Sequence, residues 1–155
     1  MTNLITKIEI LGKKPSQIYD FMLDLDKEKY IAWHPTEHID YRVVKETPDI
    51  IGSICFYHEK IDNLTVKYHW KVTELTENQE IIMKAKHLIP VYLKLKLDET
   101  SHGTLVTHNL QIGYNNGISD WIDWVVKNFI FTKNNRDSLE RHANEEFKNL
   151  ENIIK

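Results

Sequence analysis

The sequence RDSLERHANEEFKNLENIIK, residues 136–155, has the spacing of a long amphipathic helix. It is the last part of a helical region that is predicted to begin at about Ile118 and to have a kink or break near 132–135. At about 100° per residue, its apolar side chains fall on one continuous arc. That arc consists of Leu139, Ala143, Phe147, Leu150, Ile153 and Ile154, and the opposite side carries Arg141, Asn144, Glu145, Lys148 and Asn152. Because such a helix must bury its apolar arc against another element, the partner of this helix decides the fold.

The rest of the chain supplies a sheet as that partner. Alternating polar and apolar residues predict a first strand at 4–11, and residues 15–25 and 27–33 have the pattern of two short helices. Six further strands are predicted at 38–45, 53–61, 64–75, 79–88, 92–99 and 104–113, with short turns that favour antiparallel neighbours. We therefore expect an α+β fold, in which a curved antiparallel sheet grips the long C-terminal helix and leaves a cavity between them. No linker or repeat divides the chain, so residues 1–155 are predicted to form a single domain.

Composition excludes several classes of protein. The 155 residues contain 20 Lys and Arg against 23 Asp and Glu, so the basic excess of a nucleic-acid-binding protein is missing. Cys55 is the only cysteine, and the first ten residues lack the apolar run of a signal peptide, which together predict a cytoplasmic protein. The most apolar window, 118–131, is too short and too charged for a transmembrane segment. It is expected to pack on the core or close the cavity, with a homodimer contact or a membrane-surface contact as alternatives.

Two ionisable residues of the C-terminal helix are predicted to face the core. Glu146 lies in the middle of the apolar arc and His142 at its edge. A buried carboxylate without a partner costs several kcal/mol, so it must be paired, protonated or bound to a metal. His142 is about one helical turn away, so both residues can hold one cation. The alternative is an ion pair of Glu146 with Arg42 or Lys60.

Strand alternation assigns further polar residues to the inner face. His87 and His108 share faces with apolar residues and are predicted to point inward, whereas His69 is predicted to point outward. Glu59 shares one face of its strand with Cys55 and Tyr57, so it is predicted to line the cavity if that face points inward. Each of these residues also has an ordinary structural interpretation, either as a hydrogen-bonded core histidine or, for Glu59, as a member of a cross-strand ion pair.

Three short motifs resemble those of a known group of enzymes. They are WHPTEH (33–38), GSICFYHE (52–59) and the pair His142 and Glu146. With the predicted element order, they are similar to the phloretin hydrolase and 2,4-diacetylphloroglucinol hydrolase group. This group belongs to the START-like, or polyketide-cyclase-like (SRPBCC), helix-grip superfamily. The resemblance implies a zinc ion held by His38, Glu59, His142 and Glu146, with His34 as the alternative to His38. Two nitrogen and two oxygen ligands suit zinc, and manganese or iron would also be tolerated.

The same resemblance implies hydrolysis of the carbon–carbon bond between an acyl group and a phenolic ring. The predicted function is therefore a metal-dependent hydrolase acting on a small apolar or aromatic ketone. His87 or His108 would move the proton, and His34, Tyr57, Trp70 and Tyr114 would contact the substrate. The alternatives are non-catalytic binding or transport of a hydrophobic small molecule, such as a lipid or polyketide, and a metal-free cyclase or dehydratase that uses His and Tyr.

Overall fold

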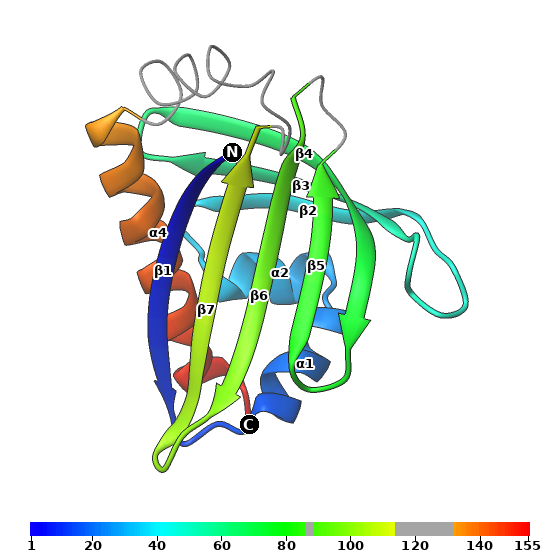
Figure 1. The fold of residues 1–155 in the computed structure, drawn as a ribbon, viewed down its shortest axis with the longest axis vertical. Helices are drawn as coiled ribbons and strands as arrows, with labels where there is room; N and C mark the ends of the chain where they lie inside the picture. The colour runs from blue at the N-terminus through cyan, green and yellow to red at the C-terminus, as the bar shows by residue number, and fades with distance from the viewer. Residues whose placement is uncertain (86–88, 114–131) are drawn as a thin grey trace.

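A curved antiparallel sheet has one long C-terminal helix on its concave side in the computed structural model, which describes residues 1–85, 89–113 and 132–155 (Figure 1). The elements follow in the order β1 (Thr2–Leu11), α1 (Pro15–Leu23), α2 (Lys27–Trp33), β2 (His38–Lys45), β3 (Ile54–Ile61), β4 (Leu64–Thr76), β5 (Glu80–Ala85), β6 (Val91–Glu99), β7 (Gly103–Ile112) and α4 (Lys133–Ile153). The described strands form one sheet in the order β1-β7-β6-β5-β4-β3-β2, and every neighbouring pair is antiparallel. The predicted α+β helix-grip fold, with two short helices after the first strand, is confirmed.

Alternation along β1 shows why the sheet has one apolar face. The side chains at positions 2, 4, 6, 8 and 10 are buried and those at 3, 5, 7, 9 and 11 are exposed, because successive residues of a strand point to opposite faces. β1 pairs along its whole length with β7, from Thr2 opposite Ile112 to Leu11 opposite Gly103. A Cβ at Gly103 would lie 2.0 Å from the Ile10 carbonyl oxygen, so this close approach of two backbones requires glycine.

The two short helices are fixed at their ends and by packing. α1 begins with Pro15, which is pre-organised for a first helical position. At the start of α2, the Asp26 side chain accepts a hydrogen bond from the Lys29 amide at 2.7 Å. At the end of α2, the Trp33 indole Nε1 donates to the Glu146 carbonyl at 2.7 Å and joins α2 to α4. The segment after Trp33 is thereby held beside the middle of α4.

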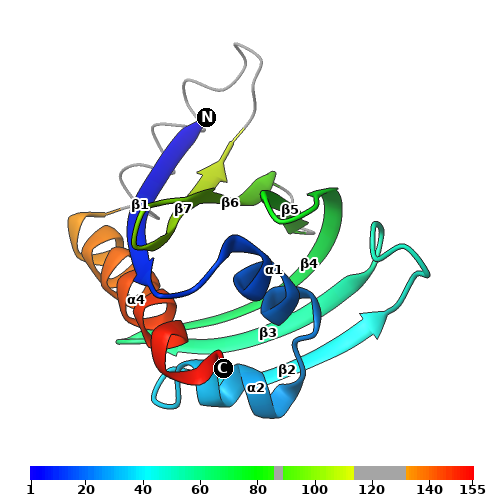
Figure 2. The same ribbon diagram turned by 90° about the horizontal axis from the view of Figure 1, so that it is seen from below.

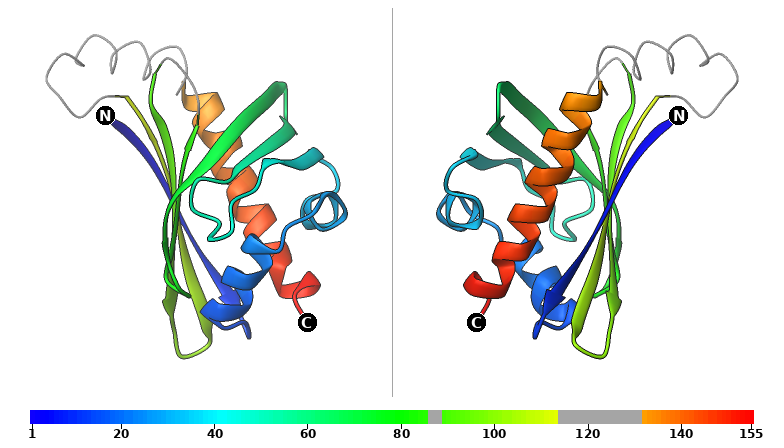
Figure 3. Two further views of the ribbon diagram at one scale, coloured as in Figure 1. Left: turned by 90° about the vertical axis from the view of Figure 1, so that its right-hand side faces the viewer. Right: turned by 90° about the vertical axis from the view of Figure 1, so that its left-hand side faces the viewer.

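The helix α4 lies on the concave side of the sheet, next to β1 and α2 (Figures 2 and 3). Its buried residues are His142, Ala143, Glu146, Phe147 and Leu150, which agrees with the predicted arc. Thr132 caps its first turn by accepting from the Asn135 amide. The predicted helical stretch before it, 118–131, lies outside the described residues.

Within the described ranges, no helix is long and apolar enough to cross a membrane.

Candidate metal centre

A cavity of about 460 Å³ lies between the concave face of the sheet and α4. Most of its described lining is apolar or aromatic: Leu4, Met22, Trp33, Ile61, Trp70, Met83, Ile89, Val91, Leu93, Leu95, Leu110, Ile112, Leu139, Ala143 and Phe147. Its ionisable lining residues include Glu59, His108, His142 and Glu146. The volume and lining are those of a site for a small, mainly apolar molecule with a few polar anchor points.

Glu146 and His142 point from α4 into the protein. They are 6% and 5% exposed, respectively. The Glu146 Oε2 atom lies 3.3 Å from His38 Nε2 and 3.6 Å from His142 Nε2, and no Lys or Arg pairs with Glu146 among the described residues. The alternative pairing with Arg42 is not formed, since Arg42 instead lies over the Phe56 ring. Burial raises the pKa of Glu146 to about 8, and the His142 charge opposes this effect.

His38, at the start of β2, presents a ring nitrogen to Glu146. Its Nδ1 lies 2.7 Å from the Tyr30 carbonyl oxygen, and its ring stacks on the Tyr30 ring with centroids 3.9 Å apart. A carbonyl can only accept, so Nδ1 carries the proton. Burial lowers the pKa of His38, which leaves the ring neutral with a lone pair on Nε2. This Nε2 atom is buried and makes no hydrogen bond within the described structure.

Glu59 lies directly opposite His38 in the β2–β3 pair. The Tyr30 hydroxyl donates to Glu59 Oε1 at 2.5 Å. The other oxygen, Oε2, lies 3.8 Å from His142 Nε2. Tyr30 therefore orients two predicted ligands, His38 through its backbone and Glu59 through its side chain.

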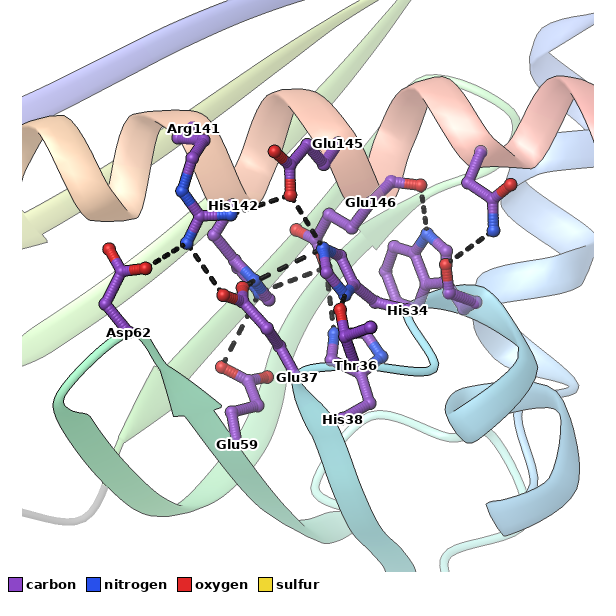
Figure 4. Close-up of polar contacts among 12 residues, drawn as sticks. His34, Thr36, Glu37, His38, Glu59, Asp62, Arg141, His142, Glu145 and Glu146 are labelled. Atoms are coloured by element: carbon purple, nitrogen blue, oxygen red, sulfur yellow. Dashed lines mark hydrogen bonds and ion pairs between the residues drawn. The ribbon is translucent and has the colours of Figure 1, made fainter.

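The orientation of His142 is set by Glu37, in the turn between α2 and β2. Its Nδ1 lies 2.6 Å from Glu37 Oε2, and the Arg141 guanidinium donates to Glu37 Oε1 at 2.7 Å (Figure 4). Burial opposes ionisation of Glu37, but the hydrogen bonds from Arg141 and His142 lower the pKa of Glu37 overall. The Nδ1 of His142 is thus the donor, and the Nε2 atom of the ring faces Glu146 and Glu59.

Three of these residues bring donor atoms close enough together to bind one divalent metal. His38, His142 and Glu146 each offer one atom within 4.8 Å of the others, and Glu59 approaches from the side of His142. In a tetrahedral site with bonds of about 2.0–2.2 Å, neighbouring donor atoms lie roughly 3.3–3.6 Å apart. The contacts of Glu146 with the two imidazoles fall in that range. A cation between the ring nitrogens and the carboxylate oxygens would favour the ionised form of Glu146, which burial otherwise disfavours.

His34 lies on the outer side of His142. Their rings stack with centroids 5.0 Å apart, while the His34 Nε2 lies 3.2 Å from Glu145 Oε2 and Nδ1 lies 3.2 Å from Thr36 Oγ1. His34 directly follows α2 and is absent from the described lining of the cavity. The geometry thus places His38 with Glu146, and the substrate contact by His34 stays a prediction.

The other predicted residues divide between the cavity and the undescribed segments. Tyr57 and Trp70 line the cavity and are buried. His108 also lines it, with a buried Nδ1 that has no hydrogen-bond partner in the described structure, and burial lowers the pKa of His108 to about 4. His87 and Tyr114 lie outside the described residues. His69 is exposed, as the alternation predicts.

Sequence spacing does not single out Tyr30 or Glu37. Tyr30 belongs to the apolar side of a short helix, where an aromatic residue ordinarily signifies packing. Glu37 lies next to His38 in the WHPTEH motif, and this position is the sequence feature that could have indicated its role. Their roles follow only once α2, β3 and α4 are brought together.

Comparisons with known proteins identify relatives in structure. No family model matches the sequence, and no curated protein matches it. A START superfamily protein from Mycobacterium smegmatis is 14% identical with a TM-score of 0.59, over 90% of this chain and 95% of that one. The polyketide-cyclase-like protein Cgl2372 from Corynebacterium glutamicum is 14% identical with a TM-score of 0.56, over 97% and 90%. The major latex-like protein 151 from Panax ginseng is 12% identical with a TM-score of 0.60, over 91% and 96%.

These likenesses extend over nearly the whole chain at low identity, so they concern the fold. The element order, the curved sheet and the enclosed C-terminal helix agree with them. The chain therefore has the helix-grip fold of START-like and polyketide-cyclase-like proteins.

Proposed function

We propose that this protein is a metal-dependent hydrolase that cleaves the carbon–carbon bond between an acyl group and a phenol-like ring. The observation that carries the proposal is the meeting of two imidazole Nε2 atoms with two carboxyl groups at the wall of an apolar cavity. Each of three ligands is also held on its remaining polar atom: His38 and Glu59 by Tyr30, and His142 by Glu37. Metal-binding residues usually have such outer partners.

His38, Glu59, His142 and Glu146 would hold zinc or another divalent transition metal. When bound, such a cation polarises a carbonyl oxygen and lowers the pKa of water towards neutrality. Tyr30 and Glu37 keep the ligand rings and carboxylate in place, so the site needs little rearrangement to receive the cation.

The net reaction uses one water molecule. A carbon–oxygen bond forms at the acyl carbon, the bond from the acyl carbon to the ring breaks, and the ring carbon receives a proton. The products are a carboxylic acid and a phenol. A group that accepts a proton and then delivers it is therefore needed beside the substrate.

His108 has the properties required of that group. It faces the cavity, and its Nδ1 has no hydrogen-bond partner among the described residues. Because burial lowers the pKa of His108 to about 4, the ring is neutral near pH 7 and has one nitrogen free to accept a proton, as a weak base. Tyr57 and Trp70 would form aromatic walls against the substrate ring.

Metal analysis and an acylphenol panel test the proposal. Protein purified without chelator should contain close to one transition metal per chain and should release a carboxylic acid from at least one acylphenol. Glu146→Gln should lose the metal and the activity, whereas Glu145→Gln, one residue away and half-exposed, should keep both. Wild-type protein that takes up no metal even after supplementation would rule the hydrolase out.

A second candidate is non-catalytic carriage of a hydrophobic small molecule, favoured by the mainly apolar lining of the cavity. In that case organic extraction should recover an apolar ligand from the purified protein. Glu146→Gln should bind the same ligand as tightly as the wild type, and no acylphenol should be turned over.

A further inference from the structure

Glu37 occupies a position that the main chain fixes on both sides. Its amide donates to the His34 carbonyl at 3.1 Å, and its carbonyl accepts from the Lys60 amide at 2.8 Å. The residue is 8% exposed and directly precedes the proposed ligand His38. Its side chain therefore starts from a point tied to both the end of α2 and the strand β3.

The two carboxylate oxygens of Glu37 have different partners on α4. Oε2 accepts from His142 Nδ1 at 2.6 Å, and Oε1 accepts from Arg141 at 2.7 Å. Arg141 also donates to Asp62 at 3.1 Å and to Glu145 at 2.6 Å. The Arg141 guanidinium thus holds Glu37 in one orientation, and Glu37 in turn holds the His142 ring.

We infer that Glu37 is the positioning residue of the metal centre, fixing the tautomer and the ring orientation of His142 so that Nε2 faces Glu146 and Glu59. This inference rests on the proposed function, because it assumes that His142 is a ligand. Tyr30 has the same role for His38 through a backbone carbonyl, which no side-chain substitution removes. Glu37 orients the His142 ring through its side chain, so this role can be tested by substitution.

Loss of this contact has two physical consequences. The His142 ring is free to rotate or to carry its proton on Nε2, and either change removes a donor. A carboxylate on Nδ1 also makes Nε2 a stronger base, and the loss of such outer partners typically costs about 10–100-fold in metal affinity.

Zinc affinity, measured by competition with a chromophoric chelator, tests the inference in Glu37→Ala and Glu37→Gln. Glu37→Ala should bind zinc about 10–100-fold more weakly than the wild type. Glu37→Gln should fall between the two, because its amide oxygen can still accept from Nδ1. Cobalt-substituted Glu37→Ala should show a changed visible spectrum, since the spectrum depends on ligand geometry and a purely structural role would not change it.

Glu145→Gln is the matched control. Glu145 accepts from Arg141 and lies 3.2 Å from His34, so its substitution removes the same charge from the same cluster without touching a proposed ligand. Its zinc affinity should stay within about twofold of the wild type, with an unchanged cobalt spectrum. Should Glu37→Ala fail to fold, Arg141→Met releases Glu37 Oε1 and should weaken zinc binding several-fold.

The outcomes separate the two proposals. If wild-type protein binds zinc and Glu146→Gln does not, but the Glu37 variants match Glu145→Gln in affinity and spectrum, the role of Glu37 is overturned and the metal centre stands. If wild-type protein binds neither zinc nor cobalt, both are overturned.

Discussion

Glu146 has surroundings that disfavour its charge. Burial among Phe147, Ala143 and the apolar cavity wall raises the pKa of its carboxyl to about 8, and the charges of Glu59 and Glu37 add to the effect. Without a cation, this carboxyl therefore takes up a proton near neutral pH. The proposed metal site would thus carry a cost in stability in the metal-free protein.

Glu146→Gln should accordingly stabilise the protein in the presence of a chelator. Below about pH 4.5 the carboxyl is protonated in both the folded and unfolded states, so the variant gains nothing. As the pH rises towards 8, the unfolded state loses its proton and the folded state does not, which destabilises the wild type. At pH 7 the free energy of unfolding of the variant should exceed that of the wild type by on the order of 2–3 kcal/mol, measured by urea denaturation.

Added zinc should reverse this order, because a ligand that binds the folded state raises its stability and the variant lacks a donor. Glu145→Gln should show no pH-dependent rise in the free energy of unfolding when chelator is present. With zinc added, it should be as stable as the wild type. The raised pKa of Glu146 would be contradicted if the difference in free energy of unfolding between Glu146→Gln and the wild type were the same at pH 5 and pH 8.

At the scale of elements, α2 and α4 meet beside the site. The Trp33 indole donates to the Glu146 carbonyl, and the Asn149 amide donates back to the Trp33 carbonyl at 2.9 Å. Edge-to-face contacts of Trp33 with Phe147 and Tyr30 complete the junction. The junction places the residues after α2 opposite His142 and Glu146.

Trp33→Phe should weaken this junction. The loss of one hydrogen bond and part of a buried ring should lower the free energy of unfolding by about 1–3 kcal/mol. The stabilisation by zinc should also fall, because His38 and Glu146 are then held less firmly relative to each other. Trp70→Phe makes the same change of volume in β4 and should leave the zinc-dependent part of the stability unchanged; equal zinc effects in both variants would count against the junction's role.

Local patterns predict the elements well and the contacts between them poorly. The bounds of α2 and β2 follow from spacing and turn residues, and the inward direction of Glu146 follows from the helical arc. His38 lies opposite Glu59 in only one register of β2 against β3. Alternation limits the possible registers but does not determine this one, because the register shifts twice within β2. The bond from Glu37 to His142 joins parts of the chain far apart in sequence, so no local pattern contains it.

At the scale of the whole molecule, the cavity shares Glu59, His142 and Glu146 with the proposed metal centre, but most of its apolar wall lies on other residues. Leu93, in β6, lines the cavity opposite Leu110, and it takes no part in the ligand cluster. Ligand volume and metal binding can therefore be changed separately.

Leu93→Trp should fill part of the cavity. The affinity for an apolar fluorescent dye should fall by about tenfold or more, at a cost of roughly 1–3 kcal/mol from overpacking, while the metal content per chain stays the same. Lys94→Trp adds the same ring on the opposite face of β6 and should not affect dye binding, which fluorescence titration measures. Equal dye affinity in both variants would mean that the dye binds elsewhere.

The helix that covers the cavity also carries His142 and Glu146. Any movement of α4 large enough to admit a guest would pull half of the donor atoms away from the other half, and the cation would be released with each cycle. The proposed hydrolase would therefore have to take in its substrate and release its products while α4 stays in place, so a cross-link between α4 and β1 should leave the proposed activity unchanged.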